Sequence, residues 1–178
     1  MTTQMLIAGF GGQGVLFAGK FLAYKALLED KQLSWLPSYG PEMRGGTANC
    51  SVVVSDEPVA SPVVTVATGL VVLNRPSLEK FEKTLLPGGH LFINSSIIDV
   101  KSTRDDIHVH YIPVNEVAEK IGNPKVGNMV MLGAFVEATK CVSMDSTINA
   151  MKAELGERKA KFFPLNEEAL KAGAELVK

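Results

Sequence analysis

The chain has 178 residues, of which 46% are hydrophobic and 21% charged, and its formal net charge is −1. This length and composition are typical of one globular domain, and the balanced charge excludes a bulk attraction to nucleic acid or to a membrane surface. Cys50 and Cys141 form no C-x-x-C motif, which excludes an iron–sulfur cluster or structural zinc held by this chain's own thiolates. No apolar run approaches the roughly 20 residues of a membrane span, and MTTQ lacks the basic segment of a signal peptide. We therefore expect a cytoplasmic protein.

The first part of the chain alternates strand and helix patterns. Met5–Phe10 is predicted to be a buried strand, and Gly14–Asp30 has the apolar spacing of an amphipathic helix. Leu33–Pro37 and the β-branched Thr47–Asp56 are predicted to be strands, separated by a loop rich in glycine and proline. Since that connection is too short for a crossover helix, the two strands are predicted to pair antiparallel.

The rest of the chain continues the alternation and then becomes helical. Gly69–Asn74 is predicted to be a buried strand, and Pro76 is well placed to open the helix Ser77–Leu85. The remaining predicted strands are His90–Asn94 and His108–Val114, and the remaining predicted helices are Asn115–Ile121, Gly127–Thr139, Ser143–Leu155 with Ser143 as its cap, and Glu167–Val177 with Asn166 as its cap. The pattern predicts one α/β domain over residues 1–178, a three-layer α/β/α sandwich with a mixed, mostly parallel sheet.

The segment GFGGQGV, directly after the first predicted strand, fits the G-x-G-x-x-G spacing of dinucleotide-binding loops. In such a loop Gly9 permits the turn, Gly11 lets a ligand approach, and Gly14 lets the helix pack closely, so the first β–α unit is predicted to be Rossmann-like. The following helix would offer free N–H groups to a phosphate. Gly12 and the amide of Gln13 favour a contact with a ligand or a partner chain over a purely structural turn.

The sequence lacks one residue that NAD binding through this loop would need. It requires an acidic residue at the end of the second strand to hold the ribose, and here that strand ends in Leu36–Pro37–Ser38. Glu29 and Asp30 lie before the strand, at the helix end. The loop is not a P-loop either, because no G-K-[ST] closes it.

The loop SYGPEMRGG is the second unusual feature, since a long loop inside a compact domain is often functional. It contains Tyr39, Glu42 and Arg44, and Arg44 can bind a phosphate or a carboxylate through two hydrogen bonds. The alternative is that Glu42 and Arg44 pair locally and Tyr39 packs on the surface, and composition alone slightly favours this alternative.

Taken together, four segments carry a resemblance to a known family. GFGGQGV, SYGPEMRGG, LVVLNRP and GNMVMLGAF, in this order, resemble the γ subunit of 2-oxoacid:ferredoxin oxidoreductases. The pairing of the two glycine-rich loops is far more specific than either loop alone. The chain is most similar to the 2-oxoglutarate type, with the branched-chain type close behind.

The resemblance implies a subunit of an enzyme that oxidatively decarboxylates a 2-oxoacid to an acyl-coenzyme A. The cofactors of such a complex are thiamine diphosphate, magnesium, iron–sulfur clusters and coenzyme A, and none is implied to bind this chain alone. The implied partners are the α and β subunits, a δ subunit in some members, ferredoxin through the complex, and a second copy of an isolated chain. The γ subunit would help to assemble the complex and to position coenzyme A, and would have no catalytic residue of its own.

The resemblance carries over one set of candidate contacts for coenzyme A or a partner subunit. The set is Gly9, Gly11, Gly12, Gln13, Gly14, Tyr39, Gly40, Pro41, Glu42, Arg44, Gly45, Gly46 and Asn128, the last at the start of a late helix, where it could cap that helix or face the same cleft. The sequence departs from the family at ATGLVV, where members carry an acidic residue, and at Arg75, where glutamine is frequent; Arg75 could add positive charge near the cleft.

Other chemistry-bearing residues have simpler interpretations. His108 and His110 share one strand face, which can bind zinc, but without a third ligand they are interpreted as exposed histidines. Two further hypotheses stay open: a stand-alone dinucleotide-binding oxidoreductase, and a structural subunit whose glycine loops serve only an interface.

Overall fold

The computed structural model describes residues 1–38 and 47–178 and contains one six-stranded sheet. The strands are β1 (Thr2–Phe10), β2 (Gln32–Ser38), β3 (Thr47–Ser55), β4 (Ala67–Val72), β5 (Leu85–Asn94) and β6 (His108–Ile112). They lie in the order β2-β3-β1-β4-β5-β6. β1, β4, β5 and β6 run parallel, and β3 runs antiparallel to both β1 and β2, which confirms the predicted mixed, mostly parallel sheet.

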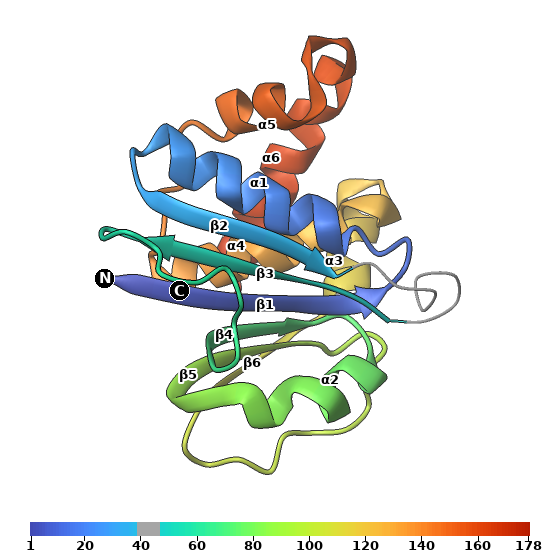
Figure 1. Cartoon of the computed structure of the whole chain (residues 1–178). Coiled ribbons are helices and arrows are strands. Elements are labelled where there is room, and N and C mark those ends of the chain that lie inside the picture. Colours follow the sequence, from blue (N-terminus) through green and yellow to red (C-terminus); the bar gives the residue numbers. More distant parts are fainter. Residues whose placement is uncertain (39–46) are drawn as a thin grey trace.

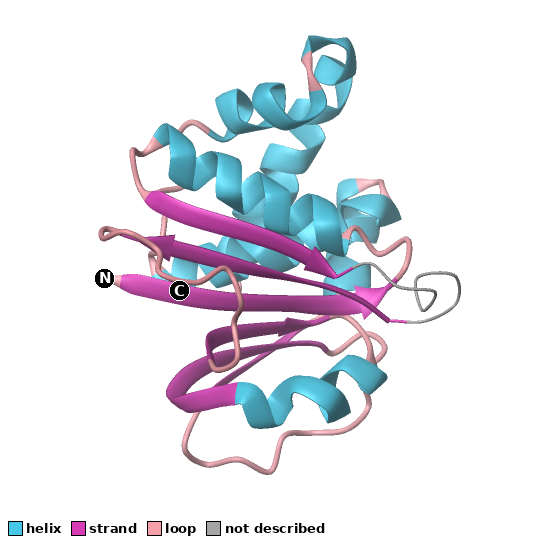
Figure 2. Ribbon diagram, in the orientation of Figure 1, coloured by secondary structure: helices cyan, strands magenta, loops and turns pink. Residues whose placement is uncertain are grey.

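The helices cover the two faces of this sheet unequally (Figures 1 and 2). They are α1 (Val15–Leu28), α2 (Arg75–Phe81), α3 (Val114–Ile121), α4 (Gly127–Thr139), α5 (Thr147–Leu155) and α6 (Phe163–Glu175), with short 3-10 turns η2 (Glu82–Thr84), η3 (Pro124–Val126) and η4 (Glu157–Phe162). The larger core joins one sheet face to α1, α3, α4, α5 and α6, and a smaller core joins the other face to α2. The three predicted layers are therefore present, with a single helix in the third layer of the described residues.

Three predicted helices have wrong bounds. α2 covers Arg75–Phe81 rather than Ser77–Leu85, because Leu85 already belongs to β5. α5 begins at Thr147 rather than at Ser143, whose backbone N–H and hydroxyl both donate to the Glu29 carboxylate, at 2.9 and 2.8 Å. α6 begins at Phe163 rather than after Asn166. Asn166 lies within the first turn of α6, where its Nδ2 donates to the carbonyl of Phe162. In α5 and α6 a side chain that suits a cap makes a different bond: Ser143 binds the distant Glu29, and Asn166 binds the nearby Phe162.

The helices α4 and α6 pack with their backbones almost in contact. A Cβ added to Gly133 of α4 would lie 1.9 Å from the carbonyl oxygen of Leu170, and one added to Gly173 of α6 would lie 1.8 Å from that of Val130. Two glycines facing each other's helix thus bring these helices together. This packing fixes α4, whose first turn reaches the carboxyl ends of the strands.

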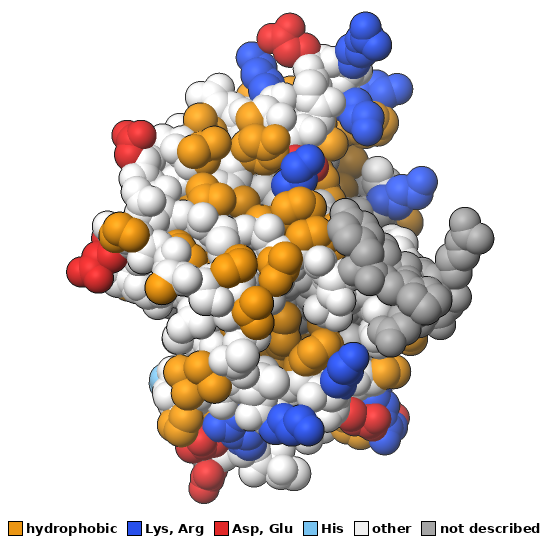
Figure 3. Space-filling view, viewed as in Figure 1, with side chains coloured by type: hydrophobic (Ala, Val, Ile, Leu, Met, Phe, Trp, Pro, Cys, Tyr) orange, Lys and Arg blue, Asp and Glu red, His pale blue; other side chains and the backbone are white. Residues whose placement is uncertain are grey.

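The described surface carries its charge unevenly. On the face drawn in Figure 3, hydrophobic side chains are spread over the middle, and lysine and arginine side chains gather at the lower end and at the upper end, where the chain passes from α5 to α6. That connection contains the exposed residues Arg158, Lys159 and Lys161. None of the described helices combines the length and the apolarity that a membrane span requires.

Candidate functional site

A cleft opens where β1 and β4 end. These strands are parallel neighbours, and the helices that follow them, α1 and α2, lie on opposite faces of the sheet. Ligands of open α/β sheets bind at such a divergence, outside the carboxyl ends of the strands. The cleft has a volume of about 200 Å³ and is lined by Gly12, Gln13, Leu73, Asn94, Val114, Asn115, Pro124, Lys125, Gly127 and Asn128.

The glycine-rich loop forms one wall of this cleft and is held from inside by Gln13. The side-chain Oε1 of Gln13 accepts a hydrogen bond from the backbone N–H of Phe10 at 2.6 Å, and its Nε2 donates to the carbonyl of Leu73 at 3.1 Å. The amide therefore joins the end of β1 to the end of β4. Both of its polar ends are bonded within the chain.

Gly9 and Gly14 have reasons to be glycine that differ from those of a dinucleotide-binding loop. A Cβ on Gly9 would lie 2.7 Å from Oε1 of Gln13 and 2.9 Å from Cβ of Leu73. Gly14 has a left-handed φ of 75°, and its Cβ would lie 2.5 Å from Nδ2 of Asn128. What approaches Gly14 closely is a side chain of α4, not the backbone of a neighbouring strand. The two glycines make room for internal side chains.

Gly11 and Gly12 form the open part of the loop. Both are exposed, and no atom lies within 4 Å of the position that a Cβ would take on Gly12. Gly12 has a φ of 91°, a conformation that side-chain-bearing residues rarely adopt. Phe10, just before them, is 42% exposed and is the large apolar side chain at this end of β1. Phe10 is not among the candidate residues predicted from the sequence.

Asn128 joins the first turn of α4 to the start of α1. It is 8% exposed, and its Nδ2 donates to the carbonyl of Gly14 at 3.1 Å. α4 has Val126 at its N-cap with no side-chain bond, so Asn128 does not cap the helix. Of the two roles considered from the sequence, the structure gives Asn128 the position beside the cleft.

The electrostatics of the cleft favour an anion. Three helices, α1, α3 and α4, start at its walls, and helix N-termini carry partial positive charge. Lys125 adds a full positive charge, and the described lining contains no aspartate or glutamate. Asn94 and Lys125 are not among the candidate residues predicted from the sequence. Asn94 could have been identified as the last residue of a predicted strand, because the carboxyl ends of parallel strands lie together.

For the second motif, SYGPEMRGG, the structure describes only the residues on either side of 39–46. Tyr39, Gly40, Pro41, Glu42, Arg44, Gly45 and Gly46 lie outside the described residues. The residues that flank this segment, Ser38 and Thr47, end β2 and begin β3, and Thr47 pairs in register with Phe10 of β1. Both flanks therefore lie at the same end of the sheet as the glycine loop.

Arg75 does not belong to the lining of the cleft. Its Nε lies 2.8 Å from the Glu79 carboxylate and its Nη1 lies 3.4 Å from that of Asp99. Both pairs are exposed, on the α2 side of the sheet. The suggestion that Arg75 adds positive charge to the cleft is therefore wrong for the described structure.

The histidines form a stack, not a row of exposed side chains. Nδ1 of His90 and Nε2 of His110 are 3.1 Å apart, and the His90 and His108 rings stack at 4.8 Å. Burial, together with the other two histidines, lowers the pKa of the half-buried His110 to about 4. Only His108 is exposed, so the expectation for His110 is wrong. No metal-binding group of three or more His, Cys, Asp or Glu side chains occurs among the described residues.

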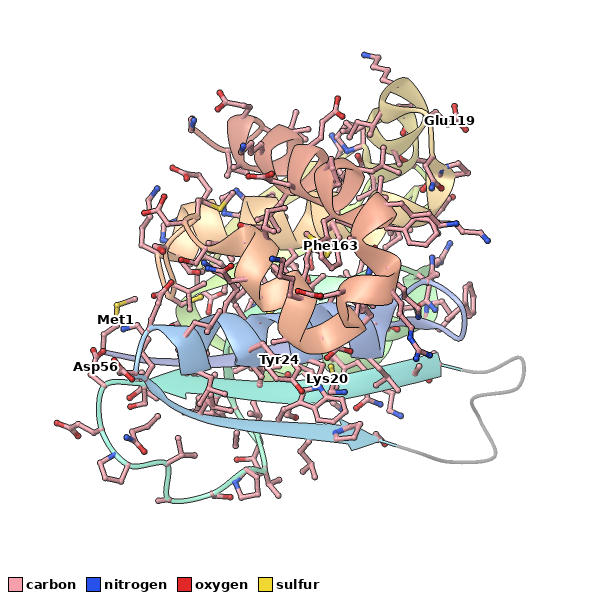
Figure 4. All side chains as sticks on the ribbon, turned by 90° about the horizontal axis from the view of Figure 1, so that it is seen from above. Met1, Lys20, Tyr24, Asp56, Glu119 and Phe163 are labelled. Carbon is pink, nitrogen blue, oxygen red and sulfur yellow. The ribbon has the colours of Figure 1, made fainter. Side chains whose placement is uncertain are left out.

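A groove with a mostly apolar lining lies between α1 and β2. It has a volume of about 250 Å³ and is lined by Lys20, Ala23, Tyr24, Leu27, Leu33 and Trp35. Figure 4 shows Lys20 and Tyr24 side by side above the strands. Lys20, the one charged residue among the described residues that line the groove, lies 3.3 Å from the Glu154 carboxylate and is therefore already paired. The groove thus offers packing surface without reactive groups.

Comparisons with known proteins agree over nearly the whole chain. The family model described as pyruvate ferredoxin/flavodoxin oxidoreductase matches residues 4–176. The ketoisovalerate oxidoreductase subunit VorA of Methanothermobacter thermautotrophicus is 40% identical over 97% of this chain, which spans only 36% of that relative. The 2-oxoglutarate synthase subunit KorC of Methanocaldococcus jannaschii is 36% identical over 85% of this chain and 82% of its own length.

A solved structure supports the same assignment. The γ subunit of a keto/oxoacid ferredoxin oxidoreductase from Geobacter sulfurreducens matches with a TM-score of 0.83 and 29% identity, over 98% of both chains. The chain belongs to the pyruvate ferredoxin/flavodoxin oxidoreductase family.

Proposed function

We propose that the chain is the γ subunit, or the equivalent domain, of a 2-oxoacid:ferredoxin oxidoreductase. The complex would oxidatively decarboxylate 2-oxoglutarate or a branched-chain 2-oxoacid to an acyl-coenzyme A. The observation that carries this proposal is the family match over residues 4–176, with relatives named as ketoisovalerate oxidoreductase and 2-oxoglutarate synthase subunits. Thiamine diphosphate, magnesium and the iron–sulfur clusters would come from the partner subunits.

The chain would act in this complex by binding and positioning, not by chemistry. The described cleft brings together open backbone, helix N-termini and Lys125, which suits a phosphate group. Its volume of about 200 Å³ is below the usual range of pockets that enclose a whole ligand. It would therefore hold one phosphate-bearing part of coenzyme A. The proposed contact region is the loop Gly9–Gly14 with Asn128 and the segment 39–46. Within it Gly11 and Gly12 are open to the ligand, and Gly9, Gln13, Gly14 and Asn128 support them from inside.

Assembly is the first test of the proposal. The chain is expressed together with candidate α and β subunits from the same organism, and the product is purified through a tag on this chain. We expect a complex that contains thiamine diphosphate and iron–sulfur clusters and that reduces ferredoxin with a 2-oxoacid and coenzyme A. A chain that stays free of larger partners under these conditions contradicts the proposal.

Coenzyme A positioning is tested within that complex at Gly11. Gly11 is exposed and has no left-handed φ, so a side chain adds no backbone strain. Gly11→Asp places a negative charge beside the cleft, and we expect the KM for coenzyme A to rise about tenfold or more. Gly11→Ala is the matched control, with a change of at most about twofold.

The interface hypothesis makes the opposite prediction for the same variants. If the glycine loop contacts only a partner subunit, Gly11→Asp weakens assembly, and the complex that does assemble keeps the KM of the wild type. Measuring the fraction assembled beside the KM separates the two hypotheses.

A further inference from the structure

Two side chains hold the glycine loop from opposite sides. Gln13 reaches the N–H of Phe10 at 2.6 Å and the carbonyl of Leu73 at 3.1 Å. Asn128, from α4, reaches the carbonyl of Gly14 at 3.1 Å. The two bonds of Gln13 join the end of β1 and the end of β4 through the loop, and the bond of Asn128 joins the end of the loop to the first turn of α4.

The glycine pattern fits these bonds closely. A Cβ on Gly9 would occupy space taken by the amide of Gln13, and a Cβ on Gly14 would occupy space taken by the amide of Asn128. Gly12 meets no such neighbour, and Gly11 and Gly12 are both exposed. The loop is thus divided into two glycines that admit internal side chains and two that leave the backbone open.

We propose that Gln13 and Asn128 are positioning residues for the phosphate-bearing ligand, here coenzyme A. They do not touch the ligand; they hold the loop so that the open backbone at Gly11 and Gly12 stands at a fixed place over the cleft. This inference rests on the proposed function. It gives the amide of Gln13 an internal role in place of a direct contact.

A positioning role for Gln13 predicts that its removal weakens ligand binding and leaves the fold intact, whereas a purely structural role predicts a loss of stability. Gln13 is only half-buried, so water can replace its bonds to Phe10 and Leu73 when the amide is removed. The fold then survives with the loop displaced, and a displacement of about 1 Å is enough to weaken a positioned contact strongly. The loss therefore falls on ligand affinity and not on folding.

The test uses the assembled complex with Gln13→Met, which keeps the length of the side chain and removes both hydrogen bonds. We expect the KM for coenzyme A to rise about tenfold, with the KM for the 2-oxoacid and kcat each within about twofold of the wild type. Asn128→Asp, which loses the donor to Gly14, is expected to change the same constant in the same direction. Gln32→Met is the control for the first variant, because Gln32 is exposed at the start of β2.

Asn166→Asp is the control for the second variant. Asn166 makes the same kind of bond, from Nδ2 to a backbone carbonyl at 2.8 Å, in the first turn of α6. It lies in a helix that does not line the cleft. Both controls are expected to leave all three constants unchanged.

Hydrogen exchange on the chain itself reads the position of the loop directly. In Gln13→Met the amide of Phe10 loses its acceptor, and we expect its exchange to accelerate about tenfold or more while that of Ile7, in the middle of β1, stays unchanged. Faster exchange with an unchanged KM for coenzyme A overturns the inference, since the amides are then structural only. If Gly11→Asp also leaves that KM unchanged, the proposed role in coenzyme A binding fails as well.

Discussion

Glycines in this chain serve three separate purposes. Gly12 supplies a left-handed turn in open space, Gly9 and Gly14 admit side chains, and Gly133 and Gly173 admit backbone. Gly133 and Gly173 tolerate substitution least, because a side chain can change its rotamer to make room, whereas a backbone carbonyl oxygen within a helix cannot move on its own. Substitution of these glycines by alanine is therefore expected to lower the free energy of unfolding by a different amount at each kind of position.

Gly173→Ala is predicted to destabilise the protein by about 3 kcal/mol or more. The added methyl group would lie 1.8 Å from the Val130 carbonyl oxygen, so α4 and α6 have to separate along their contact. Urea denaturation of the purified chain measures the change. Gly122→Ala is the control, since Gly122 has a φ of 97° and open space around it; strain alone costs about 1–2 kcal/mol. Equal losses in the two variants would contradict the packing argument.

At the scale of elements, the hydrophobic periodicity correctly predicted a helix whose bounds are set by neighbouring residues in the sequence. The helix Gly127–Thr139 has the bounds that were predicted, because a run of apolar residues between a glycine and a polar stretch defines it. The starts of α5 and α6 were missed because they depend on distant or unusual partners. Ser143 binds Glu29, which is far away in the sequence, and the 3-10 turn η4 runs directly into α6.

The histidine stack on β5 and β6 makes stability depend on pH. Burial is the main cause that lowers the pKa of His90 and of His110, the latter to about 4, whereas an unfolded histidine titrates near 6.5. A histidine with a depressed pKa stabilises the fold fully above its unfolded pKa, and this contribution disappears as the pH falls from about 6.5 to about 4. The pair cannot become doubly charged at a nitrogen separation of 3.1 Å without repulsion.

His110→Phe is predicted to flatten this dependence. Phenylalanine keeps the stacking on Phe92, whose ring lies 4.5 Å from that of His110, and removes the titrating group. Allowing for partial solvent access, we expect the wild type to lose about 2 kcal/mol more than the variant between pH 6.5 and pH 4. Urea denaturation at the two pH values measures the difference, in which contributions of carboxylates common to both proteins cancel. Parallel stability curves would contradict the prediction.

At the scale of the whole molecule, strand order decides what the glycine loop can bind. The sequence predicted the loop and the mixed sheet, but it did not predict which strands flank β1. β4 lies parallel on one side, and β3 lies antiparallel on the other. Lys125 and Asn94, far apart in the sequence, reach the cleft only through this order. The site therefore depends on long-range topology, which a local motif does not encode.

The same strand order argues against the dinucleotide hypothesis. A ribose is held by an acidic residue at the carboxyl end of the strand beside the first. Here β4 is followed by Leu73 and Asn74, and the described lining of the cleft contains no carboxylate. We therefore predict that NAD and NADP give no saturable heat of binding to the chain up to about 1 mM in isothermal titration calorimetry.

Coenzyme A titrated into the assembled complex is the positive control for that measurement. A binding heat for coenzyme A in the complex, together with none for NAD in the complex or in the chain, agrees with a cleft that selects phosphate without a ribose-binding acid. A Kd for NAD in the low micromolar range would reverse the conclusion. The loop would then work with an acidic group from outside the described cleft, and the stand-alone oxidoreductase would replace the subunit as the better hypothesis.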